Sequence, residues 1–114
     1  MLDPAKVPEV TADEIVTRYL MYSKWFRSDQ TIKHDAFMPP GDLEFSVTRL
    51  AQALEIELWR IGSDVAGDSG RTLHGRVDVL VPIFSNQRLT VSADPLAKNP
   101  NHAKVTGWPT DTAK

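Results

Sequence analysis

Apolar residues recur in this chain with two different periods, and that contrast limits the folds it can adopt. They alternate with polar residues over 43–49, 76–81 and 89–93, as in half-buried strands. Over 54–66 they recur at the three- to four-residue spacing of a helix with one buried face. A helical bundle would lack the alternating segments, and an all-β protein would lack the segment with helical spacing. We therefore expect an α+β fold.

Two helices are expected, over 12–22 and 54–66. The first follows Thr11, which stands three residues before Glu14 in the arrangement of a capping box. Gly62 lies inside the second helix, where glycine costs about 1 kcal/mol relative to alanine. This position indicates either close packing against a neighbour or an earlier end of the helix.

The alternating segments predict a three- to four-stranded, mostly antiparallel sheet packed by the two helices, with 103–106 as a further short strand. Arg49 ends a strand on its apolar side, so its charge requires a carboxylate partner. The candidate partners are Glu57, Asp78 and Asp94. A common core is expected from apolar positions of the helices and one strand: Ile15, Leu54, Leu58, Ile61, Val65, Val77 and Val79.

The length of 114 residues fits a single domain, with residues 1–10 as an extended lead-in to a domain over 11–114. The net charge of −2 is small and both signs are interspersed, which does not favour a surface dedicated to nucleic acid. The chain contains no cysteine, which excludes disulfides and thiol nucleophiles. No apolar run approaches the ~20 residues of a membrane span, and the first residues do not resemble a signal peptide. We expect a cytoplasmic protein without membrane contact.

Histidines provide the only candidate acid–base chemistry. His34, His74 and His102 are separated by 40 and 28 residues (74 − 34 and 102 − 74), spacings that fit no local metal motif. If the protein were a small nuclease or a nucleotide-handling enzyme, the catalytic residues would be His102, His74 and Arg76. Unrelated structural histidines are the favoured interpretation. We therefore expect neither a cofactor nor a metal.

An aromatic and basic cluster occupies the polar segment 24–42. Trp25, Phe26 and Arg27 could stack against and neutralise a single-stranded nucleic acid. They could equally anchor this long segment to the core, and the anchor is favoured because no wider basic stripe accompanies them.

The segment Asn99–Pro109 holds the most unusual combination of residues in the chain. Asn101, His102 and Trp108 stand there among two prolines and a glycine, which indicates ordered structure. Trp108 is either a packing residue or a binding hot spot, because tryptophan is common in both roles.

The order of short motifs resembles that of a group of small uncharacterised bacterial proteins. The motifs include patterns of the F-x-P, S-V-x-R, W-x-I-G and N-H-A-x-V-x-G-W-P types. They lie at Ala36–Pro39, Ser46–Arg49, Glu57–Gly62, Leu73–Arg76 and Asn101–Pro109. The resemblance implies a bacterial or phage-borne cytosolic protein and carries no activity with it.

The leading hypothesis is a small binding or accessory module that contacts a protein partner. Its expected binding residues are Trp25, Phe26, Arg27, Asn101, His102 and Trp108. Aromatic residues in loops favour this function, and no nucleophile–base pair or cofactor loop is visible. The enzyme described above is one alternative, and a non-catalytic nucleic-acid-binding protein is the other.

Overall fold

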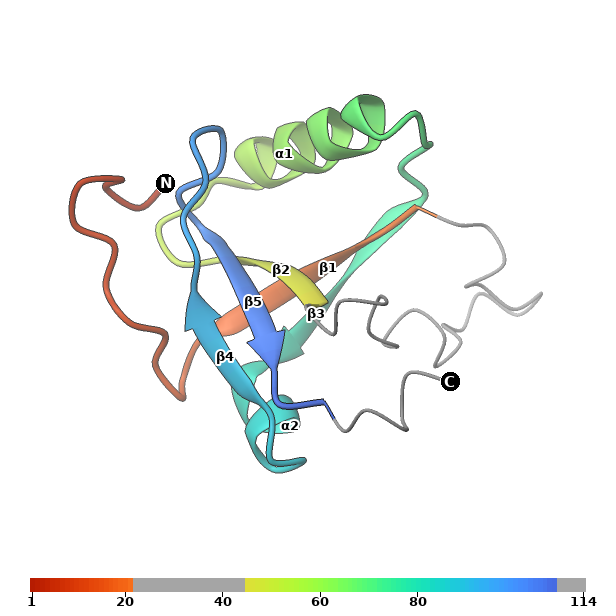
Figure 1. Ribbon diagram of the computed structural model, residues 1–114. Helices are drawn as coiled ribbons and strands as arrows, with labels where there is room; N and C mark the ends of the chain where they lie inside the picture. The colour runs from red at the N-terminus through yellow and green to blue at the C-terminus, as the bar shows by residue number, and fades with distance from the viewer. Residues whose placement is uncertain (22–44, 109–114) are drawn as a thin grey trace.

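Five antiparallel strands form one sheet in the order β3-β1-β2-β5-β4 (Figure 1). The computed structural model describes residues 1–21 and 45–108. The elements are β1 (Ile15–Leu20), β2 (Phe45–Arg49), α1 (Glu55–Asp68), β3 (Gly75–Leu80), α2 (Val81–Ser85), β4 (Thr90–Ala93) and β5 (His102–Thr106). These residues form one compact α+β domain with two helices, so the predicted fold class is confirmed and the predicted strand number is too low.

The additional strand, β1, lies within the segment 12–22, for which the predicted helix is wrong. The Thr11–Glu14 contact of the expected capping box does form, with the Thr11 amide donating to Glu14 Oε2 at 2.7 Å, but it closes a turn. The chain then enters β1, which pairs with β3 on one side and β2 on the other. A central strand is buried on both faces, so its apolar residues need not alternate with polar ones. The resulting run of apolar residues resembles the apolar stripe of a helix.

The other predicted elements are present with small shifts. The strands predicted over 43–49 and 76–81 are β2 and β3, and those over 89–93 and 103–106 are β4 and β5. The helix predicted over 54–66 is α1, and Leu54 is its N-cap residue. Residues 43 and 44 lie outside the described residues, as does the polar segment 24–42.

The two faces of the sheet have different chemistry. Tyr19 of β1 contacts α1, and the strand pairings place Thr17, Thr48 and His102 on the same face, which is therefore largely polar. Val16, Phe45 and Val105 lie on the opposite face, where they pack with Phe84 of α2. α1 and α2 accordingly cover opposite faces of the sheet.

The main core therefore lies away from α1, and part of the predicted core is wrong. Leu58 and Ile61 are buried as predicted, and Val77 and Val79 are half-buried. The predicted core residues that are instead exposed are Leu54 (66 %), Val65 and Ile15. The prediction placed one face of α1 in the same core as the strand residues. In the structure α1 instead covers the polar face of the sheet, so fewer of its apolar residues are buried.

Arg49 is a fully buried residue whose charge is neutralised by Glu14, not by any of the three predicted partners. Its guanidinium donates to Glu14 Oε1 at 2.7 Å and Oε2 at 2.8 Å, and to the carbonyls of Pro8 and Glu9. The true partner was missed because its segment was predicted to be the first turn of a helix. As a strand lead-in, Glu14 instead lies next to the end of β2, where Leu50 N–H donates to Ile15 O.

At Gly62, α1 lies close against Tyr19 of β1 and against Leu73. A Cβ atom there would lie 2.6 Å from Cε1 of Tyr19 and 3.1 Å from Cδ2 of Leu73. The Tyr19 hydroxyl donates a hydrogen bond to the Leu58 carbonyl of the same helix, so the ring cannot easily move aside. Of the two explanations considered for Gly62, close packing is the one observed.

Gly62→Ala should therefore lower the free energy of unfolding by about 1–2 kcal/mol, since overpacking outweighs the gain in helix propensity. Gly67→Ala is the matched control, because a methyl group at that position would meet no described atom within 4 Å outside its own turn of the helix. The control should raise stability by up to about 1 kcal/mol. Urea denaturation measures whether each variant gains or loses free energy of unfolding. A gain in Gly62→Ala would contradict the close packing at this position.

Candidate binding groove

A groove of about 540 Å³ lies between α1 and the polar face of the sheet. Its apolar wall comes from Ile61 and Val65 of α1 and from Leu96 of the loop between β4 and β5. Ser46 and Thr48 of β2 also line it, and their short side chains leave space under the helix. Ligand sites typically have volumes of about 300–1,000 Å³, so this groove can hold a ligand or a side chain of a partner.

Two hydrogen bonds between distant segments lie beneath the groove. Asn99 Nδ2 donates to Thr48 Oγ1 at 3.0 Å, which ties the loop to β2. The Tyr19 hydroxyl donates to the Leu58 carbonyl, which ties β1 to α1. Burial raises the pKa of Tyr19 to about 12, so the phenol is neutral.

Asn101 extends this network to the N-terminal segment. Its side chain has no exposed surface, and its Oδ1 accepts from Leu2 N–H at 2.8 Å. Its Nδ2 donates to the carbonyls of Arg49 and Ala51 at 2.7 and 2.8 Å. The Asn101 amide N–H donates to Oδ1 of Asn99, which joins the two parts of the network. The two asparagines therefore hold residues 1–2, the end of β2 and the loop together.

Asn101→Ala should lower the free energy of unfolding by about 2–3 kcal/mol, because it leaves buried backbone groups at Leu2 and Arg49 without partners. Asn86→Ala is the matched control, since Asn86 is exposed after α2 and should change stability by less than about 0.5 kcal/mol. Thermal melts compare the two. Equal stability of both variants would mean that the buried network contributes nothing.

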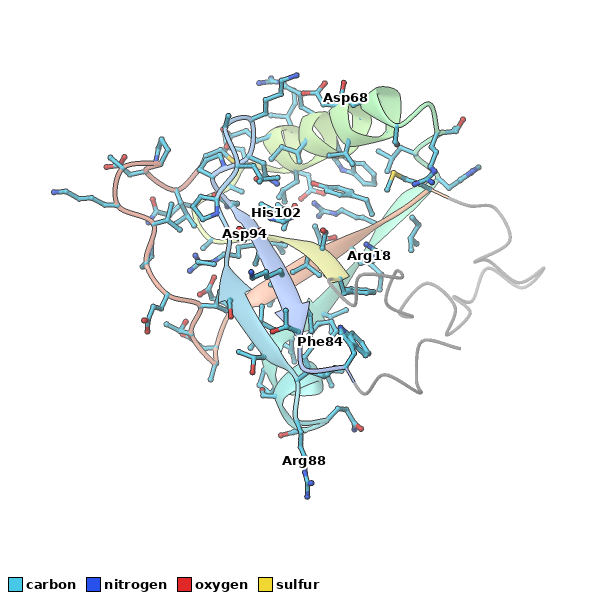
Figure 2. All side chains as sticks on the ribbon, in the orientation of Figure 1. Arg18, Asp68, Phe84, Arg88, Asp94 and His102 are labelled. Atoms are coloured by element: carbon cyan, nitrogen blue, oxygen red, sulfur yellow. The ribbon has the colours of Figure 1, made fainter. Side chains whose placement is uncertain are left out.

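His102 is the titratable residue that lines the groove from β5. Figure 2 shows it beside Asp94, where β4 meets the loop. Its Nδ1 lies 2.9 Å from the Asp94 carbonyl and 3.3 Å from Asp94 Oδ2, and the Asp94 amide donates back to the His102 carbonyl. These contacts fix the orientation of the ring.

Charged residues of both signs surround the groove. Lys98 Nζ lies 3.9 Å from Asp68 Oδ2, so an exposed ion pair links the loop to the last turn of α1. Such a pair contributes at most about 1 kcal/mol. Arg18 covers the ring of Phe45, with 4.1 Å from its Cζ to the ring centroid, and donates to the Ser46 carbonyl.

The structure assigns different roles to the predicted binding residues. His102 lines the groove, whereas Asn101 is structural. Trp108 packs on Phe45 at 5.8 Å between ring centroids and donates from Nε1 to the Val105 carbonyl, so it belongs to the core on the opposite face. The predictions for Trp25, Phe26 and Arg27 concern positions outside the described residues.

The proposed catalytic set does not converge. Arg76 is on β3 and His74 directly precedes that strand, whereas His102 is on β5, and β1 and β2 lie between them. Three strand spacings of roughly 4.8 Å separate these positions by about 14 Å. Arg76 is also engaged by Glu55, with Nη2 2.7 Å from Oε1, and lies over the Trp59 ring. His34 lies outside the described residues.

Sequence reasoning missed three residues that shape the groove. Tyr19 lies in the segment that was predicted to be a helix, and Thr48 and Asn99 were not identified as partners. The signal that could have revealed Asn99 is its place in Asn99-Pro100-Asn101, because two amides around a proline are typical of a hydrogen-bonded loop.

Comparisons of the chain with protein-family models, with curated proteins and with solved structures found no match. Within residues 1–21 and 45–108, no three histidine or acidic side chains form a group that could hold a metal ion. In the same part of the chain, no helix is long and apolar enough to cross a membrane.

Proposed function

We propose that this protein is a non-catalytic binding module that contacts another protein through the groove between α1 and the sheet. The observation that supports it is the apolar surface beside the groove. Val65 on α1 and Leu96 on the loop are 42 % and 49 % exposed, although both line the groove. A small ligand within the groove would leave much of this surface in water, whereas a partner chain would cover it.

Two further observations favour binding over the alternatives. The separation of His102 on β5 from His74 and Arg76 at β3 counts against the enzyme hypothesis, which needs these side chains close together. Arg76 is committed to Glu55 and has a side chain that is 10 % exposed, so it is a poor phosphate contact. The nucleic-acid alternative requires Lys24, Arg27, Lys33, Arg71 and Arg76 on one face. Arg71 is exposed, and Lys24, Arg27 and Lys33 lie outside the described residues. The expected cytoplasmic location remains part of the proposal, and cell fractionation would test it.

Affinity capture from a lysate of the source organism tests the proposal. The bait is the full chain, compared with Leu96→Asp, which places a charge at the groove, and Ile83→Asp, which changes a similarly exposed apolar residue on α2. We expect a partner that the unmodified chain and Ile83→Asp retain and that Leu96→Asp loses. Identical recovery by all three baits, or no specific recovery, would contradict the proposal. Circular dichroism confirms that both variants are folded.

A further inference from the structure

β3 lies at one edge of the sheet, and its outer side carries unpaired backbone groups. Among the described strands it pairs with β1 alone. The Val81 amide donates to the Glu14 carbonyl, and hydrogen-bonded residue pairs alternate along an antiparallel ladder. The backbone groups of Val77 therefore point toward β1, whereas those of Arg76 and Asp78 point away from it. The described part of the chain leaves this outer row without hydrogen bonds, which makes it a template for another strand.

The side chains of β3 have different chemistry on the two faces of the sheet. Val77 and Val79 lie on the core face and are only half-buried. Arg76 and Asp78 lie on the face covered by α1. The Asp78 side chain is 40 % exposed, and its Oδ1 lies 3.6 Å from Arg76 Nε, beyond the distance of a good hydrogen bond. The carboxylate can therefore accept a further contact.

Arg76 also retains an unused donor. Its Nη2 donates to Glu55 Oε1 at 2.7 Å, and its guanidinium lies over the ring of Trp59. Its Nη1 is buried and has no hydrogen-bond partner. A single charge in an edge strand opposes pairing with another chain. Two opposite charges on one face can instead neutralise each other across two chains, as opposite charges do in neighbouring strands.

A second copy of the chain supplies a strand whose charges match in one register. A two-fold axis perpendicular to the sheet places the same faces of the two copies side by side, so only residues of the same face are opposed. When Val77 lies opposite Val77 of the second copy, each Arg76 lies opposite the other Asp78. An axis at Asp78 or at Arg76 would oppose like charges, which destabilises a strand pair.

The same register uses the outer backbone groups of β3. Arg76 and Asp78 of the two copies form two hydrogen-bonded pairs, each of which exchanges both N–H···O bonds. Val77 at the axis forms a non-hydrogen-bonded pair, in which the Cα atoms lie about 4.5 Å apart and the side chains are close. β4, at the opposite edge, has four residues, none of them charged, so its side chains select no register.

We infer that two copies of this chain pair through their β3 edges and join their sheets into one continuous antiparallel sheet. An interface made mainly by two short strands is small, so the dimer should be reversible, with a dissociation constant of roughly 10–100 µM. No residue of β3 lines the groove between α1 and the sheet. The inference is therefore independent of the proposed partner contact, and either can fail without the other.

Disulfide cross-linking tests the register, because the chain contains no cysteine. In Val77→Cys the two thiols face each other at a Cα separation that a disulfide can span. Val79→Cys is the matched control, since its two copies would lie four residues apart along the strand, roughly 14 Å. Under mild oxidation, non-reducing gels should show a covalent dimer for most of Val77→Cys and for little of Val79→Cys. Equal cross-linking of the two variants, or none in either, would overturn the inference.

Sedimentation equilibrium of charge variants tests the same pairing without a cross-link. Asp78→Lys and Arg76→Glu each oppose like charges, so each alone should raise the dissociation constant by at least about tenfold. An equimolar mixture restores opposite charges at both positions and should dimerise again. Glu9→Lys, which makes the same change of charge at an exposed side chain outside β3, should dimerise like the unmodified chain.

Two results of the sedimentation experiment would contradict the inference. One is an unmodified chain that stays monomeric up to about 1 mM, at which a dimer of the expected affinity would predominate. The other is a mixture that stays monomeric although circular dichroism shows both charge variants to be folded. If Arg76→Glu does not fold, the two cysteine variants decide.

Discussion

Glu14→Gln should lower the free energy of unfolding by about 3–5 kcal/mol, because it leaves the guanidinium of Arg49 buried without a counter-charge. Arg49 is 1 % exposed, and Glu14 is its only carboxylate contact among the described residues. The remaining acceptors are the carbonyls of Pro8 and Glu9, which do not neutralise the charge. Urea denaturation at neutral pH measures the loss.

Glu9→Gln is the control, because it removes the same charge from an exposed side chain five residues earlier (14 − 9). It should change stability by less than about 0.5 kcal/mol. A loss below about 1 kcal/mol in Glu14→Gln would show that the pair contributes no more than a surface ion pair.

The same pair predicts a dependence of stability on pH. Burial acts to raise the pKa of Glu14, but the hydrogen bonds from Arg49 and Thr11 and the charge of Arg49 outweigh it, so the pKa lies below 4.5. The carboxylate is thus favoured by folding, and its contribution is present above that value. It is lost as the pH falls through the lowered pKa. Denaturation between pH 7 and pH 3 should show a steeper loss for the unmodified chain than for Glu14→Gln.

Trp108→Ala should cost about 3–4 kcal/mol of folding stability and leave binding at the groove unchanged. Trp108 packs on Phe45 and against the core on the face away from α1. Trp59→Ala is the control, because Trp59 is 39 % exposed on α1, and it should cost less than about 1.5 kcal/mol. Thermal melts measure stability, and capture of the partner at low temperature measures binding.

The alternative role of Trp108 as a hot spot predicts the reverse pattern. A variant of normal stability that has lost the partner would place Trp108 at the interface and would move the binding site away from the groove.

Local periodicity predicted most of the fold, and its failure has a definite cause. Alternation of apolar and polar residues in the sequence identified β2, β3 and β4, and buried and half-buried residues alternate along β5. In β1 four of six residues are buried, so alternation is masked. The β-branched residues Ile15, Val16 and Thr17 favour a strand, and they were the evidence in the sequence against a helix.

The candidate site could be predicted only in part, because its contacts join distant segments. The unusual segment Asn99–Pro109 was singled out, and in its described part Asn99 and Asn101 are buried and hydrogen-bonded to β2. The groove itself depends on α1 lying over the polar face of the sheet, which no local pattern encodes. The pairing of Thr48 with His102 across β2 and β5 likewise follows from strand order alone.

The anchoring of the N-terminal segment by Asn101 has a consequence for how the chain reaches its native state. The bond from Leu2 to Asn101 spans 99 residues, and β1 and β2 each pair with strands far along the chain. Among the described strands only β4 and β5 pair locally, so we expect this hairpin to form early and the N-terminal segment to dock last. A topology dominated by non-local pairs folds in roughly milliseconds to seconds. In stopped-flow refolding, Asn101→Ala should therefore accelerate unfolding far more than it slows folding.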